Sequence, residues 1–383
     1  MKYATQLSRV FTGVLFILSG FIKANDTLGF SYKLEEYFEI FHKEFPLPQF
    51  LGFDWMSFAA MAEPLSMFIC IFEILCGVAL LLGAFARLNA WLLLVMIVFF
   101  TVLTGYSAIT NKVTDCGCFG DAIKLKPIES FFKDLFLLLM ILFIFFGVKN
   151  IKPLFNKTIQ NILLSVALLV STFFTFYTFM FLPRIDFLPY KIGNDITEKM
   201  KCPVGSPTDS FAMVFIYEKN GVKEEFDMNH LPSDTNYKFV DRIDKQVRVG
   251  CKPPIHDFVI YDENGIDFTD SLFAKDEYKL VLIQKNSKDG RQGLEKQMAA
   301  LANDWTQQSH LQFWALSNTS HDEIEAYRHE HQLSFPYYLV DGTPLKSMIR
   351  SSPGLILMKK STVVKKWSAY NFPDYSIVLK YMK

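Results

Sequence analysis

The chain changes character near residue 184. Before this point, five apolar runs are nearly free of charged residues, whereas after it short apolar stretches alternate with polar turns. A bilayer core of about 30 Å needs roughly 20 apolar residues in a helix. The pattern therefore predicts five membrane-spanning helices, at residues 10–22, 65–84, 88–110, 131–148 and 158–183.

The first apolar run is short and has a basic residue on each side. Arg9 and Lys23 can extend along the helix so that their charged groups reach the two interfaces. A basic start and a short apolar centre are also typical of a signal peptide, but no small-residue cleavage site follows at residues 20–25. We therefore expect a helix that is not cleaved.

Lys and Arg near the ends of membrane helices indicate which ends face the cytoplasm. The short segments on one side of the predicted bundle contain no acidic residue and carry Lys2, Arg9, Arg87, Lys149, Lys152 and Lys157. The longer loops on the other side carry basic residues at lower density. We therefore expect a cytoplasmic N-terminus, with residues 111–134 and the C-terminal half in an extracytoplasmic compartment, where disulfides persist.

The first long loop has a pattern of its own. Between residues 28 and 45, apolar residues recur at three- and four-residue spacing. This spacing predicts an amphipathic helix that lies on the bilayer surface or caps the bundle.

Two cysteines separated by one glycine lie in the polar gap between the third and fourth apolar runs, in Asp115-Cys-Gly-Cys-Phe-Gly-Asp121. A disulfide within such a short segment closes a small, strained ring, and strained exposed disulfides are usually labile and oxidising. Lys124 and Lys126 would favour the thiolates, whereas the two aspartates would oppose them. We expect Cys116 and Cys118 to form a redox pair.

Two other interpretations of the motif stay open. Either thiol could form a static crosslink, within the loop or to Cys202 or Cys251. The motif's aspartates and cysteines could also bind a metal, but no histidine lies nearby and such mixed ligation is uncommon. We therefore expect no metal site.

Glu73 is an ionisable residue well inside the second apolar run. Acidic groups at membrane depth are costly and often functional, which makes Glu73 a candidate proton handler. It could equally fix helix packing through a hydrogen bond to Thr101 or Thr104. Cys70 and Cys76 lie on different faces of the same helix, and we expect both to pack in apolar surroundings.

Several short motifs in the first half match one family of membrane proteins: Arg9-Val-Phe-Thr-Gly13, Leu18-Ser-Gly-Phe-Ile-Lys23, Leu34-Glu-Glu-Tyr-Phe38, Glu73 with Gly77, and Leu80-Leu-Leu-Gly83. Together they resemble the DoxX family, and the Cys-Gly-Cys-Phe-Gly loop resembles its methylamine-utilisation MauE branch. The resemblance covers about residues 5–150. It implies an integral protein of the bacterial inner membrane that is linked to disulfide formation or respiratory electron flow.

The C-terminal half begins with a hairpin signal. Asn220-Gly221 separates two β-type runs, at residues 211–219 and 222–228, and Cys202 and Cys251 bracket this region as a candidate structural disulfide. Beyond it, strands and helices alternate, as in an α/β layer. We expect strands at 258–261, 278–284, 313–317, 337–340, 354–358 and 363–367, with helices at 292–305, 321–331 and from 373.

This order of elements resembles the thioredoxin-like fold in its membrane-anchored TlpA branch. Residues 254–265 match the opening hairpin of that branch, and Ser352-Pro353-Gly-Leu-Ile-Leu matches the segment that carries its cis-proline. The resemblance implies that Pro353 lines a partner-binding groove. The two-cysteine motif of the fold is missing, because residues 284–291 contain no cysteine and none follows Cys251.

These patterns predict a mixed fold, with an N-terminal α-helical transmembrane bundle and a C-terminal α/β thioredoxin-like domain. We expect a DoxX/MauE-like four-helix bundle at residues 1–150, a fifth membrane helix at 151–183, a hairpin-containing linker at 184–250 and the thioredoxin-like domain at 251–383.

Two functional hypotheses follow. In the first, the protein is a thiol–disulfide redox component that passes electrons between an extracytoplasmic protein client and a membrane carrier, with a quinone as candidate cofactor. In the second, it is a non-enzymatic assembly protein that binds a partner through its thioredoxin-like domain. A transporter is disfavoured, because no pair of interrupted helices is present. The net charge of zero and the lack of a basic tract exclude nucleic acid as an expected partner, whereas membrane lipid is one.

Overall fold

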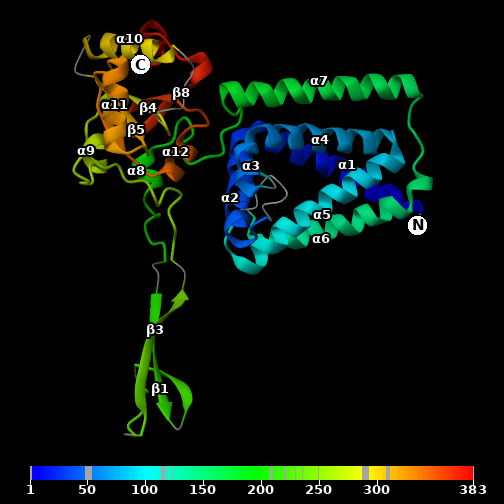
Figure 1. Cartoon of the computed structure of the whole chain (residues 1–383), viewed down its shortest axis with the longest axis horizontal. Coiled ribbons are helices and arrows are strands. Elements are labelled where there is room, and N and C mark those ends of the chain that lie inside the picture. Colours follow the sequence, from blue (N-terminus) through cyan, green and yellow to red (C-terminus); the bar gives the residue numbers. More distant parts are fainter. Residues whose placement is uncertain are drawn as a thin grey trace.

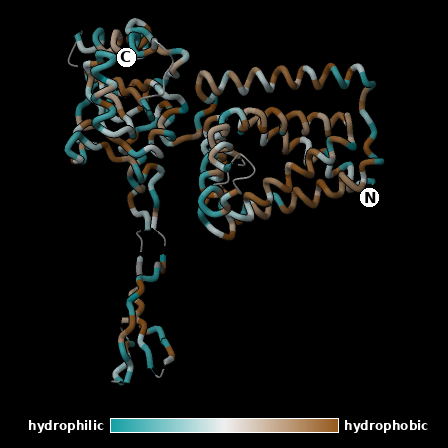
Figure 2. Tube along the Cα trace, in the orientation of Figure 1, coloured by the Kyte–Doolittle hydropathy of each residue, from teal (hydrophilic) through white to brown (hydrophobic). Residues whose placement is uncertain are grey.

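A computed structural model describes residues 2–382 except 48–53, 114–116, 118, 124, 208–209, 220, 229, 235, 249, 287–292 and 308–310. The described chain forms a helical bundle, a mixed α/β domain at one end of it and a separate β-sheet arm (Figure 1). The apolar residues concentrate in the long helices of the bundle (Figure 2).

The bundle contains five long helices: α1 (Lys2–Asn25), α4 (Ala62–Leu82), α5 (Ala86–Thr110), α6 (Pro127–Phe146) and α7 (Lys157–Phe181). By length and composition, four of the described helices, α1, α4, α5 and α7, can cross a membrane. Most of the remaining predicted span, residues 131–148, lies in α6, which carries Glu129, Lys133 and Asp134 near its start. The chain is therefore a multi-pass membrane protein.

The amphipathic segment forms α2 (Thr27–Glu44), which covers one end of the bundle together with α3 (Trp55–Ala60) (Figure 1). Its apolar side is buried in the bundle core at Phe30, Leu34, Tyr37 and Phe38. Tyr37 shares a 2.7 Å hydrogen bond with Ser107 of α5. Helix α2 therefore caps the bundle, which is one of the two positions that the sequence predicted for it.

The prediction that Arg9 and Lys23 extend to the membrane interfaces is wrong. Arg9 donates from Nε to the carbonyl of Leu80 at 2.9 Å and from Nη2 to that of Leu81 at 2.7 Å. Both carbonyls lie in the last turn of α4, where carbonyls lack the amide of a following turn, and the buried Arg9 supplies donors to them. The carbonyl of Leu80 also accepts the amide of Gly83 at 3.1 Å. Lys23 is 2% exposed and pairs with Glu73 inside the bundle.

Helices α1 and α4 cross at glycines. A Cβ atom at Gly77 would lie 2.8 Å from the carbonyl oxygen of Gly13 and 3.0 Å from the backbone nitrogen of Ile17. Small residues allow membrane helices to approach backbone to backbone in this way.

We expect Gly77→Ala to lower the free energy of unfolding by about 1–3 kcal/mol, because backbone atoms cannot yield to the added methyl group. Denaturation of the full chain in mixed micelles measures this change. Gly105→Ala is the matched control, since its Cβ would meet a ring carbon of Phe131 at 3.1 Å and a side chain can move. Equal stability of the two variants would contradict the close crossing.

The C-terminal domain has a five-stranded sheet in the order β6-β5-β4-β7-β8. Its strands are β4 (Tyr278–Ile283), β5 (Gln312–Ser317), β6 (Tyr337–Leu339), β7 (Gly354–Lys359) and β8 (Thr362–Ser368). The first three are parallel, and β7 pairs antiparallel with both β4 and β8. The helices are α8 (Ile196–Lys199), α9 (Thr269–Ala274), α10 (Leu294–Gln307), α11 (His321–His331), α12 (Gly342–Met348) and α13 (Tyr375–Leu379).

This topology and the cis Ser352–Pro353 bond directly before β7 make the domain thioredoxin-like. One face of the sheet packs on α9 and α12, and the other packs on α10 and α13. The expected mixed fold class is confirmed. The strand expected at 258–261 is reduced to isolated bridges at Tyr261, and the short helices α9 and α12 were not expected.

The arm consists of β1 (Ser210–Lys219), β2 (Val222–Asp227) and β3 (Lys238–Arg248) in the order β2-β1-β3. It projects from the C-terminal domain (Figure 1). The predicted hairpin is confirmed, since β1 and β2 pair antiparallel and Lys219 is opposite Val222. The expected disulfide between Cys202 and Cys251 is formed at the base of the arm.

Candidate functional site at the junction of the two domains

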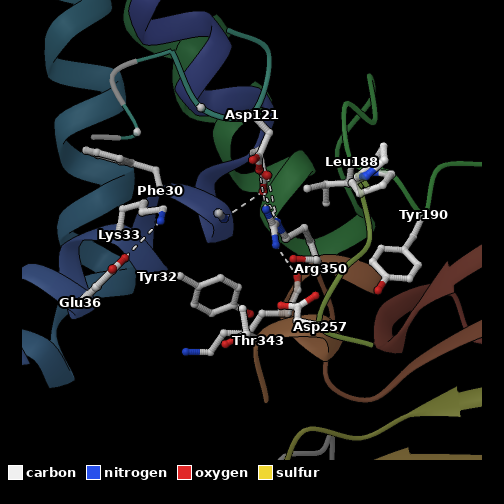
Figure 3. Close-up of a pocket in the computed structure, with 18 of the residues that line it drawn as sticks. Phe30, Tyr32, Lys33, Glu36, Asp121, Leu188, Tyr190, Asp257, Thr343 and Arg350 are labelled. Atoms are coloured by element: carbon white, nitrogen blue, oxygen red, sulfur yellow. Dashed lines mark hydrogen bonds and ion pairs between the residues drawn. The ribbon is translucent and has the colours of Figure 1, made fainter. Parts of the chain in front are cut away.

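The cysteine motif lies at the end of the bundle that faces the C-terminal domain. Cys116 and Cys118, the expected redox pair, are outside the described residues, but their neighbours Gly117, Gly120 and Asp121 are described. These three residues line a cavity of about 780 Å³ between α2 and α12 (Figure 3). The volume is within the range of roughly 300–1,000 Å³ found for small-molecule sites.

The backbone of the motif needs its glycines. Gly117 has φ +66° and Gly120 has φ +51°, both in the left-handed region that favours glycine. The amide of Gly120 donates to the carbonyl of Gly117 at 3.1 Å, which closes a turn. Gly117 is buried, and a Cβ there would lie 3.2 Å from Cγ of Lys33 on α2. The motif is therefore held against the cap helix.

Arg350, just after α12, joins the C-terminal domain to the bundle. Its Nε donates to both carboxylate oxygens of Asp26 at 2.9 Å, and its Nη2 donates to Asp121 at 2.8 Å. Figure 3 shows the guanidinium directed at Asp121. Arg350 is 7% exposed. Burial acts to lower the pKa of Arg350, but the charges of Asp26 and Asp121 outweigh it and hold the pKa above its ordinary value.

Asp26 also begins helix α2. As the N-cap residue, it accepts the amide of Gly29 at 2.9 Å while it binds Arg350. A Cβ at Gly29 would lie 2.9 Å from Nη2 of Arg350, so only glycine leaves room for the guanidinium at this helix end. The same carboxylate therefore starts the cap helix and holds the other domain.

Tyr32 of α2 meets the cis-proline side of the thioredoxin-like domain. Lys285 donates from Nζ to the phenol oxygen of Tyr32 at 2.6 Å, and Arg350 stacks over its ring at 5.6 Å. Burial raises the pKa of Tyr32, so the phenol stays neutral. Lys285 comes directly after β4 and Gln284, where the redox motif of the fold would begin, and its amide donates to Oγ of Ser352 at 3.0 Å. Pro353 is buried beside this contact, and its role in partner binding stays a prediction.

Glu73 is 4% exposed and forms a 2.7 Å ion pair with Lys23 of α1. The Lys23 ammonium also lies 4.4 Å from the ring centre of Phe100. The expected packing partner was wrong, because Thr104 donates to Asp134 at 2.9 Å instead. Neither Lys23 nor Glu73 lines the cavity of Figure 3, so the pair lies apart from the cysteine motif.

The remaining candidates are outside this junction. Cys70 and Cys76 are buried free thiols in α4, as expected for packing residues. Over the described part of the chain, no group of three or more His, Cys, Asp or Glu side chains could hold a metal ion. Of the four members of the alternative metal site, Asp115, Cys116 and Cys118 lie outside the described residues, and Asp121 is paired with Arg350.

Sequence reasoning missed Arg350, Asp26 and Tyr32. Asp26 did carry a signal, because an aspartate just before an amphipathic run is a typical N-cap. Arg350 carried none, since its partner Asp26 is 324 residues away.

Comparisons with known proteins match separate parts of the chain. No curated protein matches it. Two solved structures similar to about a third of the chain are a proposed protein disulfide isomerase from Bacteroides thetaiotaomicron (15% identity, 33% of this chain and 83% of that one, TM-score 0.27) and a PrxQ variant from Xylella fastidiosa (14% identity, 33% and 87%, TM-score 0.25). Residues 211–249, in the arm, match a domain of unknown function (DUF8463). Residues 1–147 match the family model of the methylamine utilisation protein MauE, so the N-terminal part of the chain is similar to that family.

Proposed function

We propose that this protein is a membrane thiol–disulfide redox component, in which Cys116 and Cys118 pass electrons from a client dithiol to a quinone in the membrane. One observation carries the proposal. Gly117, Gly120 and Asp121 of the cysteine motif line the cavity beneath the thioredoxin-like domain, and Asp121 is bonded to Arg350 of that domain. These described neighbours of the two cysteines support a site that a client held by the C-terminal domain would reach.

In the proposed exchange, a client thiolate attacks one sulfur of the Cys116–Cys118 disulfide, which breaks the S–S bond and forms a mixed disulfide. A second client thiolate displaces the bound cysteine, so the client leaves as a disulfide and the motif as two thiols. The client has lost two electrons and two protons. A quinone then takes up two electrons and two protons, becomes a quinol and restores the Cys116–Cys118 disulfide.

In this proposal the thioredoxin-like domain positions the client and does no redox chemistry, because no cysteine follows Cys251. The density of basic residues at the helix ends supports a cytoplasmic N-terminus. The cysteine motif and the C-terminal domain, which lie at the same end of the bundle, would then act at the outer face of a bacterial inner membrane.

Reconstituted full-length protein tests the redox step. A peptide with two cysteines and a short-chain quinone are added, and quinone reduction is followed by its loss of absorbance. We expect one quinol per peptide disulfide, and no reaction with the Cys116→Ser/Cys118→Ser variant. Cys70→Ser/Cys76→Ser is the matched control and should keep the activity, since both thiols are buried in α4. Equal rates for the Cys116/Cys118 variant and the wild type would refute the proposal.

The alternative is a non-enzymatic assembly protein that binds a partner through its C-terminal domain. The lack of a cysteine motif after β4 favours it. In that case the Cys116→Ser/Cys118→Ser variant would bind its client normally, and a chain without residues 252–383 would not.

A further inference from the structure

A second cavity, of about 750 Å³, lies where helix α7 ends and the chain enters the C-terminal domain. Its walls come from the last turn of α7, the connecting segment 182–192, strand β8 and the end of the chain. Tyr177, Phe181, Trp367 and Tyr381 contribute aromatic rings to it. This cavity is separate from the cysteine motif, whose described residues do not line it.

The lining of this cavity is strongly basic. Arg184, Lys191, Arg350, Lys365 and Lys366 line it, against a single carboxylate, Asp186. That carboxylate is already bound by the buried Lys366 at 2.8 Å, and Arg350 is held by Asp26 and Asp121. Three cations therefore remain, and among the residues that the structure describes none of the three forms an ion pair.

Aromatic rings hold two of these cations in place. Arg184 donates to the phenol oxygen of Tyr177 at 3.2 Å and lies 5.5 Å from the centre of its ring. The ammonium of Lys365 lies 5.0 Å from the ring centre of Tyr381. Cations that stack on rings keep donors free for an anion, because the ring contact uses no N–H group in a hydrogen bond.

The position of the cavity identifies the kind of anion. Helix α7 exposes apolar side chains along its length, with Leu169 at 69% and Phe173 at 73% exposure. Its last turn leads directly to the cavity at Phe181. Tyr177 lies near this end, as aromatic residues do at membrane interfaces. A lipid whose acyl chains lie on α7 would therefore place its headgroup at these cations. A soluble anion would make no use of the exposed apolar side chains of α7.

We infer that this cavity binds the phosphate headgroup of an anionic phospholipid, through Arg184, Lys191 and Lys365. The lipid would tie the C-terminal domain to the bilayer at the exit of α7. Basic pockets beside membrane helices recognise anionic headgroups by the same chemistry. The inference does not depend on the proposed redox function, because it uses none of its residues.

Lipid binding to the full chain in nanodiscs tests this inference. The probe is phosphatidylglycerol that carries a quencher, titrated into phosphatidylcholine discs and followed by the loss of tryptophan fluorescence, since Trp367 lines the cavity. Each basic residue near an anionic membrane contributes roughly a fivefold change in affinity, so Arg184→Gln/Lys191→Gln/Lys365→Gln should lose on the order of a hundredfold. Lys245→Gln/Lys275→Gln/Lys296→Gln removes three exposed lysines far from α7 and should change nothing.

The charge-preserving variant Lys191→Arg/Lys365→Arg should bind as the wild type does, and its binding should weaken as salt is raised. Circular dichroism of each variant shows whether it is folded before its affinity is compared. Unchanged phosphatidylglycerol binding by the folded triple Gln variant would overturn the inference. So would a wild type that prefers phosphatidylglycerol no more than phosphatidylcholine, or that loses the lipid to an equal concentration of inorganic phosphate.

Discussion

Replacing Arg350 by methionine is expected to release the thioredoxin-like domain from the bundle. The substitution keeps the apolar volume of the side chain but leaves the carboxylates of Asp26 and Asp121 without their cation. Removing one partner of a buried ion pair typically costs about 3–5 kcal/mol. Hydrogen exchange of the full chain in nanodiscs measures the effect, as faster exchange in the first turn of α2, where the Gly29 amide is bonded to Asp26.

The structure supplies a matched control four residues before Arg350, in α12. Lys346 and Glu35 form a 3.3 Å pair across the same junction, with side chains 43% and 38% exposed. Exposed pairs contribute about 0–1 kcal/mol, so Lys346→Met should leave exchange in α2 nearly unchanged. Arg350→Lys keeps the charge but loses the planar fork and should fall between the two. If exchange in Arg350→Met matched the wild type, the junction would not depend on this residue.

The second large effect is expected inside the bundle. Glu73→Gln removes the charge that faces the Lys23 ammonium, which is buried beside Phe30 and Phe100. We expect a loss of about 3–5 kcal/mol in the free energy of unfolding, since a buried charge loses its counter-charge. Lys23→Met/Glu73→Leu replaces both charges by apolar groups and should recover most of this loss. Denaturation of the wild type, Glu73→Gln and the double variant in mixed micelles measures both changes.

The same double variant separates the two roles considered for Glu73. If it is stable and its quinone reduction is lost, Glu73 handles protons for the cysteine pair. If it is stable and fully active, the acid serves packing alone. A double variant as unstable as Glu73→Gln would contradict the coupling between Lys23 and Glu73.

Local sequence patterns predicted those helices and strands whose formation depends on a single short stretch of sequence. The long apolar runs and the Asn220-Gly221 turn are such cases, because hydrophobicity and turn chemistry act over a few neighbouring residues. Strand β3 was missed because charged residues interrupt its apolar positions between Asp241 and Lys245. It becomes a strand by pairing with β1. Helix α12 was missed because it is short and contains Gly342 and Pro344.

The junction could not be predicted, because its contacts join distant parts of the chain. Lys23 at the edge of an apolar run has the pattern of an interfacial residue, and only the packing of α1 on α4 brings it to Glu73. Arg350 resembles any surface arginine until α2 places Asp26 against it. Sequence identified the cysteine motif as the candidate site, and the fold places its described residues beneath the other domain.

The redox state of Cys116 and Cys118 in native membranes tests whether this pair exchanges electrons with quinones. Free thiols are blocked with one alkylating reagent, disulfides are reduced, and the newly exposed thiols are labelled with a second reagent of different mass. We expect a largely oxidised pair while quinones are oxidised, and a shift to two thiols when respiration is blocked and the quinone pool is reduced. A pair that stays fully oxidised under both conditions would mark a static crosslink and contradict the proposed electron transfer.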